Sequence, residues 1–297
     1  MKNWTTTMCV LGLVLGFAAA ATAQDNPALT FKFTKANVPG AVSDQPGGVN
    51  NAGVTVGYYI DTAGLMHGYI LNGKKVTTLD DPNGKTGTTA GSNLNPAGPI
   101  SVVGFYTSNS TGDAVGFLYK SGKFTDIPGP SGAVNAYGSA INDSGAIVGY
   151  YSDSTGVYHG FLLKGGTYTT LDVPGAADTF ATGINKQGSI VLYWLNSSGT
   201  YEGSIYNGKN YKTINVPGAA DSYPLDNNAA GDVCFEWQDS ASVIHGALLH
   251  GGKYYKFDYP KSTATYGGGL NDKSTVTGGY QTAAGGSDWF GYKATYK

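Results

Sequence analysis

Residues 137–175, YGSAINDSGAIVGYYSDSTGVYHGFLLKGGTYTTLDVPG, decide the fold of this 297-residue chain. Four short segments of this stretch are rich in β-branched and aromatic residues, which favour strands: 139–141, 146–151, 159–163 and 168–173. Turn-forming residues separate them, and no gap is long enough for a helix. Turns this short can only reverse the chain, so the stretch predicts a four-stranded antiparallel meander.

Marker residues show that this unit recurs six times. An asparagine follows the first strand of each copy at spacings of 43 to 47 residues, and a proline ends the fourth strand. These markers are Asn50, Asn95, Asn142, Asn185, Asn228 and Asn271, with Pro39, Pro82, Pro128, Pro174, Pro217 and Pro260. A period of about 40–50 residues with four strands per copy is typical of propeller blades. The sequence therefore predicts an all-β protein, a six-bladed β-propeller of four-stranded antiparallel blades.

The two ends of the chain complement each other. Only six residues follow Gly291, so the sixth copy lacks its fourth strand. Residues 33–40, FTKANVPG, align with 168–175, YTTLDVPG, and supply a spare fourth strand at the amino end. We expect this N-terminal strand to complete the last blade, because closing the ring removes exposed sheet edges.

The first 23 residues have the features of a secretory signal peptide. A lysine precedes a short apolar run, and an Ala-Thr-Ala cleavage motif ends at Ala23. Residues 24–297 are then one propeller domain of six repeats, which we expect to be secreted, either extracellular or periplasmic. Cys234 becomes the single cysteine, so no intramolecular disulfide is predicted, and its place in a strand indicates a buried side chain.

Charge and composition exclude several partners. The chain has 18 basic residues, all lysine, against 20 acidic ones, and no basic run. This balance argues against nucleic acid and anionic lipid as partners. We expect no membrane span in the mature protein, no cofactor and a monomer. No motif of a known nucleophile, zinc or phosphate site is present.

The reference unit resembles the HAF-type extracellular repeat of bacterial secreted proteins. Residues 141–149, INDSGAIVG, match its I-N-x-x-G-x-V-V-G strand, and 159–162, HGFL, match its H-A-F-L strand. The resemblance covers about residues 33–294 and implies a repeated extracellular β-fold. It carries no assigned activity, so it transfers no catalytic residue. The family's histidine is present in three of the six copies, at His67, His159 and His245.

One row of aromatic residues suggests a ligand site. Tyr137, Phe180, Tyr223 and Tyr266 each stand five residues before a marker asparagine. If the first strand lines the axis, these rings lie near one mouth of the propeller, where they could stack on sugars or wedge neighbouring blades together. Asp178 and Asp221, in matching loops on the same face, could bind hydroxyl groups or cap turns.

Two other sets have structural explanations. A second aromatic row is occupied in every copy and predicts core packing between blades: Tyr59, Tyr106, Tyr151, Trp194, Trp237 and Tyr280. The three repeat histidines occupy one strand position in separate blades. Because zinc ligands must converge within a few ångströms, we expect no metal site from them.

Glu236 interrupts the repeat. It replaces an aromatic residue found at Tyr58, Phe105, Tyr150 and Tyr193, and Glu202 is the only other glutamate. Glycosidases use a pair of carboxylates at a defined separation. Glu236 is therefore a weak catalytic candidate, and no other catalytic residue is predicted.

Three functions remain open. The aromatic and aspartate rows favour a non-enzymatic binding or interaction propeller for carbohydrate or a cell-surface polymer. A hydrolase or lyase acting on polysaccharide would use Glu236. A structural component of the extracellular matrix or envelope would need no site. Propellers serve all three purposes, so the fold alone does not choose.

Overall fold

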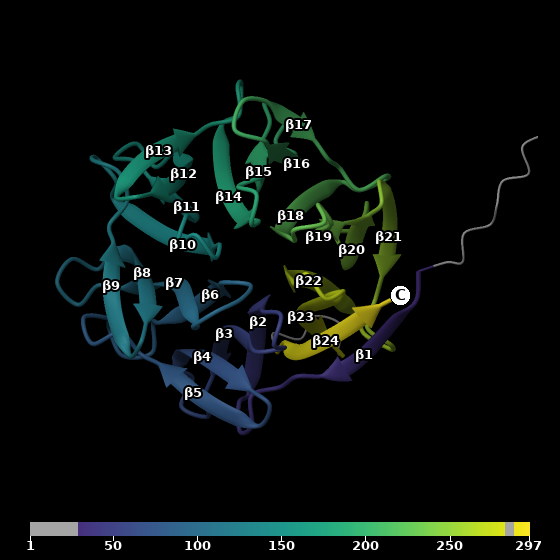
Figure 1. Cartoon of the computed structure of the whole chain (residues 1–297), viewed down its shortest axis with the longest axis horizontal. Coiled ribbons are helices and arrows are strands. Elements are labelled where there is room, and N and C mark those ends of the chain that lie inside the picture. The colour runs from purple at the N-terminus through teal and green to yellow at the C-terminus, as the bar shows by residue number, and fades with distance from the viewer. Residues whose placement is uncertain (1–28, 283–287) are drawn as a thin grey trace, which may run out of the picture.

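The computed structural model describes residues 29–282 and 288–297, which form six four-stranded antiparallel sheets arranged radially in a closed ring (Figure 1). The predicted propeller is confirmed. The predicted signal peptide, residues 1–23, lies outside the described residues. Within the described ranges there is no helix with the length and apolarity to cross a membrane.

Each sheet is one blade, numbered here in chain order. Blade 1 is β2 (Ser43–Val49), β3 (Thr55–Ile60), β4 (Met66–Asn72) and β5 (Lys75–Leu79), and blade 2 is β6 (Ala90–Leu94), β7 (Ser101–Thr107), β8 (Ala114–Lys120) and β9 (Lys123–Ile127). Blade 3 is β10 (Asn135–Ile141), β11 (Ile147–Ser152), β12 (Tyr158–Lys164) and β13 (Thr167–Leu171), and blade 4 is β14 (Asp178–Ile184), β15 (Ile190–Leu195), β16 (Tyr201–Tyr206) and β17 (Tyr211–Thr213). Blade 5 is β18 (Asp221–Asn227), β19 (Val233–Gln238), β20 (Ile244–His250) and β21 (Lys253–Phe257), and blade 6 is β22 (Ala264–Leu270), β23 (Thr275–Gln281), β24 (Phe290–Tyr296) and β1 (Phe31–Lys35).

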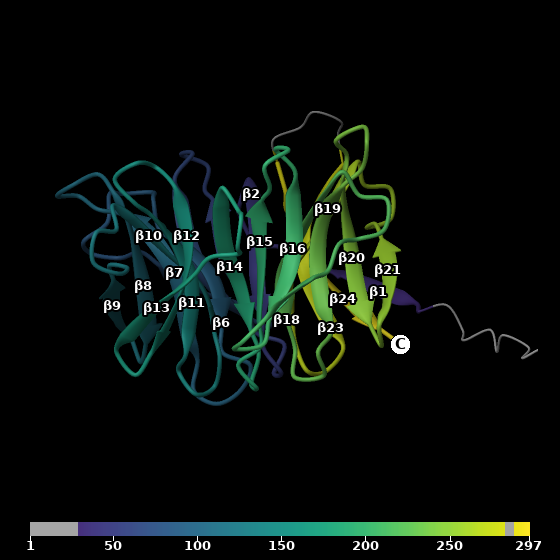
Figure 2. The ribbon, with the colours of Figure 1, turned by 90° about the horizontal axis from the view of Figure 1, so that it is seen from above.

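Blade 6 is built from both ends of the chain, as predicted. β1 lies antiparallel beside β24, with Phe31 opposite Tyr296 and Lys35 opposite Tyr292. Figures 1 and 2 show the two strands side by side, β1 on the outer edge of the sheet. The ring of Phe31 packs on Phe257 of blade 5 at 4.6 Å between centroids, so the amino-terminal strand also adds apolar contact to the neighbouring blade.

In blades 3 to 6 the marker asparagine holds the first turn and ties it to the next blade. Oδ1 of Asn142 accepts hydrogen bonds from the backbone amides of Ser144 and Ala146, both at 3.1 Å. Its Nδ2 donates to the backbone oxygen of Asn185 in blade 4 at 3.1 Å. The same inter-blade bond continues from Asn185 to Asn228 (3.0 Å), from Asn228 to Asn271 (3.2 Å) and from Asn271 to Asn50 (2.9 Å). The last of these bonds joins blade 6 to blade 1, so the asparagine series closes the ring as well as linking blades.

Blade 2 departs from this pattern because its first turn is longer. Oδ1 of Asn95 accepts from the backbone amide of Ser101 at 2.7 Å, and its Nδ2 donates within its own loop to the oxygen of Ala97. The link to blade 3 is made instead by Asp143, which accepts from the amide of Ala97 at 2.8 Å. The longer turn of blade 2 thus replaces one inter-blade bond by another.

The core lies between the blades. The buried apolar residues form six clusters, and the second aromatic row contributes one member to each of them. Tyr106, Trp237 and Tyr280 of this row are almost fully buried. The predicted core role of the row is confirmed. Cys234 is buried and free, and its Sγ lies 3.4 Å from the oxygen of Gly268.

On the second and third strands of each blade, one small residue is paired with one large residue. In blades 1, 2, 3 and 6 a glycine faces an aromatic residue: Gly57 and Tyr69, Gly104 and Phe117, Gly149 and Phe161, Gly278 and Tyr292. A Cβ on Gly149 would lie 2.0 Å from the oxygen of Tyr137 and 2.7 Å from Phe161, so a side chain there collides. Blades 4 and 5 reverse the arrangement, with Leu192 opposite Ser204 and Phe235 opposite Ala247. Total volume in each layer is thereby kept near native packing density.

Replacing Asn185 with alanine should destabilise the protein by at least about 2 kcal/mol, because two turn amides and a carbonyl of the next blade lose buried partners. Denaturant unfolding measures the change. Asn207→Ala is the matched control, since Asn207 accepts two similar amides in an exposed turn without an inter-blade bond. Equal losses in the two variants would contradict the linking role of the marker.

The pairing of one small and one large residue predicts that substitutions at positions 192 and 204 of blade 4 are energetically coupled. Ser204→Phe alone overpacks a buried site, and Leu192→Gly alone leaves a cavity. Together they recreate the blade 3 arrangement, so the double variant should be more stable than the sum of the single changes by about 1–2 kcal/mol. A double-mutant cycle of unfolding free energies checks this, and additive effects would contradict it.

Candidate functional site

A bulge in every first strand points one residue at the axis. The first strands lie nearest the centre of the ring (Figure 1), and each pairing with the second strand shifts register at one residue. The six bulge residues are Gly47, Ser92, Ser139, Thr182, Leu225 and Gly268. All six line one cavity of about 300 Å³. Bulges re-aim side chains, and here they give the cavity a floor with three hydroxyl groups, from Ser92, Ser139 and Thr182.

Aromatic side chains form the walls. Tyr58, Phe105, Tyr137, Tyr150, Tyr266 and Trp289 line the cavity together with Gln45. Tyr266 and Trp289 meet edge to face at 5.2 Å between centroids, and Phe105 meets Tyr137 in the same way at 5.0 Å. A volume of about 300 Å³ is at the lower end for small-molecule sites, and aromatic walls with a few polar groups are typical of them.

The repeat itself explains where this cavity opens. Blade 3 carries aromatic residues at both mouth positions, Tyr137 and Tyr150, whose rings stack at 4.6 Å, and blade 4 does the same with Phe180 and Tyr193 at 4.7 Å. The matching first-strand positions of blades 1 and 2 hold Gln45 and Ala90, which face Tyr58 and Phe105. The equivalent second-strand positions of blades 5 and 6 hold Glu236 and Gly279. Four of the twelve mouth positions therefore lack a ring, and they lie in the adjacent blades 5, 6, 1 and 2.

The structure divides the predicted aromatic row. Tyr137 and Tyr266 line the cavity, whereas Phe180 and Tyr223 do not. Phe180 packs against Tyr150 of blade 3, and Tyr223 against Tyr193 of blade 4, at centroid distances of 5.1 and 5.2 Å. Both expected roles, ligand wall and wedge between blades, thus occur in one row. The row lies inside the first strands rather than before them, because these strands begin earlier than the apolar pattern indicated, β10 at Asn135.

Asp178 and Asp221 lie outside the cavity lining. Oδ1 of Asp178 accepts from the amide of Tyr158 at 2.8 Å, and Oδ1 of Asp221 accepts from the amide of Tyr201 at 2.7 Å. Each bond joins the first strand of one blade to the third strand of the preceding blade. Asn135 makes the equivalent bond to the amide of Ala114 at 2.9 Å, so this position caps a strand of the neighbouring blade.

Glu236 is the only charged side chain among the described residues that line the cavity. It lies on β19 between Tyr223 of β18 and Gly246 of β20. No hydrogen bond or ion pair joins its carboxylate to any described residue. Burial raises the pKa of Glu236 to about 7. The carboxyl group therefore holds its proton more tightly than an exposed glutamate, and none of the described residues donates a hydrogen bond to it.

A polar pair closes the axis beneath the floor. Asp226 is buried, and its carboxylate accepts from the amides of Leu270 at 3.0 Å and Asn227 at 2.9 Å. The side chain of Asn93, from the opposite side of the ring, also hydrogen bonds to it. Burial raises the pKa of Asp226 to about 7, against the opposing effect of these hydrogen bonds. Because Asp226 and Asn93 meet, the cavity has a blind end.

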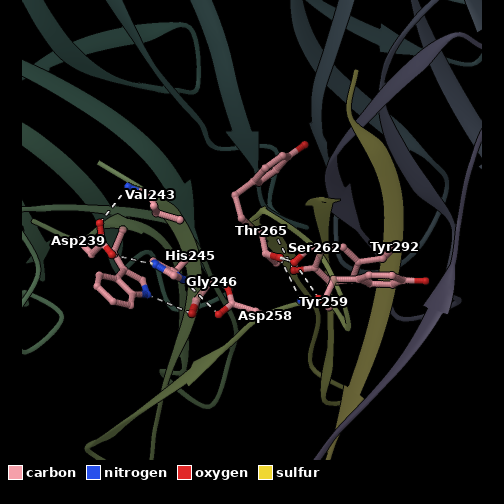
Figure 3. A network of polar contacts seen from close by, with 11 residues as sticks. Asp239, Val243, His245, Gly246, Asp258, Tyr259, Ser262, Thr265 and Tyr292 are labelled. Carbon is pink, nitrogen blue, oxygen red and sulfur yellow. Dashed lines mark hydrogen bonds and ion pairs between the residues drawn. The ribbon is translucent and has the colours of Figure 1, made fainter. Parts of the chain in front are cut away.

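The three repeat histidines form separate clusters, one each in blades 1, 3 and 5. Figure 3 shows the cluster of His245, whose Nδ1 lies 3.0 Å from Asp258 and whose Nε2 lies 3.5 Å from Asp239. Its ring stacks on Trp237 at 4.6 Å. His159 and His67 have the same surroundings, with Tyr151 and Tyr59 in place of the tryptophan. Burial lowers the pKa of His67, but hydrogen bonds and charges from Asp80 and Asp61 outweigh it and raise the pKa above its usual value.

Each histidine thus joins a turn aspartate to an aspartate at the end of the outer strand. Figure 3 also shows the turn beyond Asp258, where Ser262 Oγ donates to the oxygen of Tyr259 at 2.7 Å. In blade 4 the histidine position holds Glu202, which accepts from Asn196 at 2.7 Å and lies outside the cavity lining. Among the described residues, no group of three or more histidine, cysteine or acidic side chains is arranged to hold a metal ion.

Several lining residues were not predicted as site residues. The sequence analysis used three of them, Tyr58, Phe105 and Tyr150, only as the repeat position that Glu236 interrupts. Trp289, which stands directly before β24, was not considered. The sequence did contain one signal for the cavity. Gln45 and Ala90 stand five residues before their marker asparagines, where the other four copies have aromatic residues. The bulge residues carry no signal in the sequence, because only the strand register shows them.

No protein-family model and no curated protein sequence matches this chain. Membership of the HAF-type repeat family therefore stays a prediction.

Solved structures of low sequence identity share the fold. A Hadza microbial sialidase, Hz136, superposes with a TM-score of 0.55 at 11% identity, covering 86% of this chain and 66% of that one. The SapL1 lectin in complex with α-methyl fucoside gives 0.52 at 13% identity, over 87% and 95% of the two chains. AofleA from Arthrobotrys oligospora gives 0.52 at 12% identity, over 88% and 84%. At these identities the likeness shows the fold alone.

The raised pKa of Glu236 predicts a pH-dependent stability. A folded carboxyl that holds its proton more tightly than the unfolded one makes the protein lose stability as the pH rises from about 4.5 to 7. Glu236→Gln removes this loss, so its stability relative to the unmodified protein should increase between pH 5 and pH 8, by up to about 3 kcal/mol.

Denaturant unfolding at several pH values measures this difference. Glu202→Gln, the substitution of the only other glutamate, is the control and should give a nearly constant difference over the same range. A Glu236→Gln difference that is equal at pH 5 and pH 8 would contradict burial of the carboxyl group.

Proposed function

We propose that this protein is a carbohydrate-binding propeller that holds a sugar unit in the axial cavity. The observation that carries the proposal is a blind cavity with aromatic walls, three hydroxyl groups in its floor and one carboxyl group that no described residue contacts by a hydrogen bond. Flat rings pack on the C–H faces of sugars, while hydroxyl, amide and carboxylate groups bond their hydroxyls. Tyr137 and Tyr266 provide ring faces, and Ser139 and Gln45 provide polar partners.

The fold comparison supports this choice in a limited way. The SapL1 lectin holds α-methyl fucoside on a chain with the same ring architecture. That likeness transfers no binding residue, so the site proposed for this chain depends on its own cavity. We further propose that the protein acts outside the cytoplasm, since residues 1–23 have the pattern of an export signal.

The cavity favours binding over glycoside hydrolysis. Glycosidases need two carboxyl groups about 5–10 Å apart around the scissile bond. Among the described residues that line the cavity, Glu236 has no second carboxylate beside it. A single carboxyl group with free hydrogen-bond acceptor positions suits recognition of a ligand better than glycoside hydrolysis, which needs two carboxyl groups.

Glycan-array screening followed by calorimetry tests the proposal. Tyr137→Ala removes a wall and Ser139→Leu fills the floor, so each should weaken binding by about tenfold or more, the size of one lost aromatic or polar contact. Tyr168→Ala is the control, because Tyr168 packs on Phe161 away from the cavity. Thermal unfolding should show that all three variants fold.

Two results would overturn the proposal. One is the absence of binding to every glycan on the array. The other is binding that neither Tyr137→Ala nor Ser139→Leu weakens, which would place the glycan elsewhere on the ring. Release of cleaved sugar during the binding measurements would replace binding by hydrolysis as the function.

A further inference from the structure

Resting on the proposed function, we infer that the cavity selects a sugar unit that carries a free, positively charged amine, with the ammonium group held between Glu236 and the aromatic walls.

The first argument is the missing partner of Glu236. Two buried carboxylates near the axis or its mouth differ from it: Asp226 accepts two amides, and Asp44 accepts from the amides of Val38 and Gly291. Glu236 is partly buried and lines the aromatic cavity, and no donor contacts its carboxylate among the described residues. A carboxylate with reduced access to water and no protein donor is suited to a ligand that brings both a donor and an opposite charge.

The second argument is the nature of the walls. The faces of Tyr, Trp and Phe rings are electron-rich and attract cations, most strongly where water is excluded. Six aromatic side chains line this cavity, and no lysine or histidine does so among the described residues. The protein therefore places no cation of its own next to Glu236. A sugar ammonium would meet a carboxylate and ring faces in the same space.

The third argument is the floor, which suits the sugar body. Ser92 and Ser139 present hydroxyl groups, and Gln45 presents an amide. Thr182 already donates its hydroxyl to the oxygen of Pro224 at 2.7 Å, so it can serve the ligand only as an acceptor. These neutral groups suit ring hydroxyls and offer no counter-charge to an acidic sugar. We expect affinity to fall from amine-bearing to neutral to acidic sugars.

The raised pKa of Glu236 makes binding of an amine depend on pH. An ammonium group beside the carboxyl lowers its pKa, so binding releases a proton where the free protein is still protonated. Affinity for the amine should therefore rise from pH 5 to pH 7. It should fall again at higher pH, where the amine itself loses its proton.

Chitosan-type oligomers provide the test. We would compare a fully deacetylated glucosamine tetramer with the N-acetylated tetramer of the same length by calorimetry at pH 7. The unmodified protein should bind the amine form about tenfold more tightly, the size of one charge-assisted contact. Glu236→Gln should reduce this preference to less than about threefold, because affinity for the amine form falls more than affinity for the acetylated form. Glu202→Gln should keep the full preference.

Choline tests whether the cavity needs a sugar ring as well as a positive charge, because it carries the charge without the ring. It should bind more weakly than the glucosamine tetramer, since the floor then has no hydroxyl partner. Tighter binding of choline would overturn the assignment to a sugar.

Other outcomes separate this inference from the proposed function. Equal or tighter binding of the acetylated tetramer by the unmodified protein would overturn the amine selection and leave carbohydrate binding standing. An amine preference that survives in Glu236→Gln would also overturn the inference, because another group would then be responsible. Failure of both tetramers, with binding of other glycans on the array, overturns the inference alone, whereas failure of every glycan overturns both.

Discussion

A single side-chain amide per blade sets the geometry of this propeller. In blades 3 to 6 the marker asparagine satisfies its own turn with Oδ1 and reaches the carbonyl of the next marker with Nδ2, as Asn185 does with Asn228. The markers Asn142, Asn185, Asn228 and Asn271 that share this bond are also the ones spaced by 43 residues. Blade 2 has a longer turn, and there Asp143 of blade 3 makes the link.

The marker asparagines restrict which residues can occupy one end of the axis, whereas the residues at the other end vary between blades. Near the asparagine turns the axis is closed by Asp226 and Asn93. At the cavity-lining positions between the strand starts and the bulges, the residue differs from blade to blade, as Gln45, Ala90 and Tyr137 show. The exceptions to the repeat, including Ala90 and Glu236, gather there and shape the cavity. Departures from a repeat mark function when they occur where the repeat no longer constrains packing.

The sequence predicted the ring, the six blades and the closing strand because its markers report backbone geometry that every copy must share. It predicted the site only in part. Tyr137, Tyr266 and Glu236 do line the cavity, but Phe180 and Tyr223 pack between blades. A row of equivalent positions identifies a face of the molecule, but it does not say on which side of the axis space remains. The bulge residues of the floor were beyond prediction, since a register shift of one residue leaves the apolar pattern almost unaltered.

The pairing of β1 with β24 makes assembly of this molecule a non-local event. Thr34 and Lys293, bonded across that seam, are 259 residues apart in the chain. Each of the first five sheets can form from neighbouring segments, but the sixth must wait until the last strand has been synthesised. Until β1 and β24 pair, each presents an unpaired backbone edge that can recruit strands from other molecules. Conditions that delay the meeting of the two ends should therefore favour aggregation over loss of individual blades.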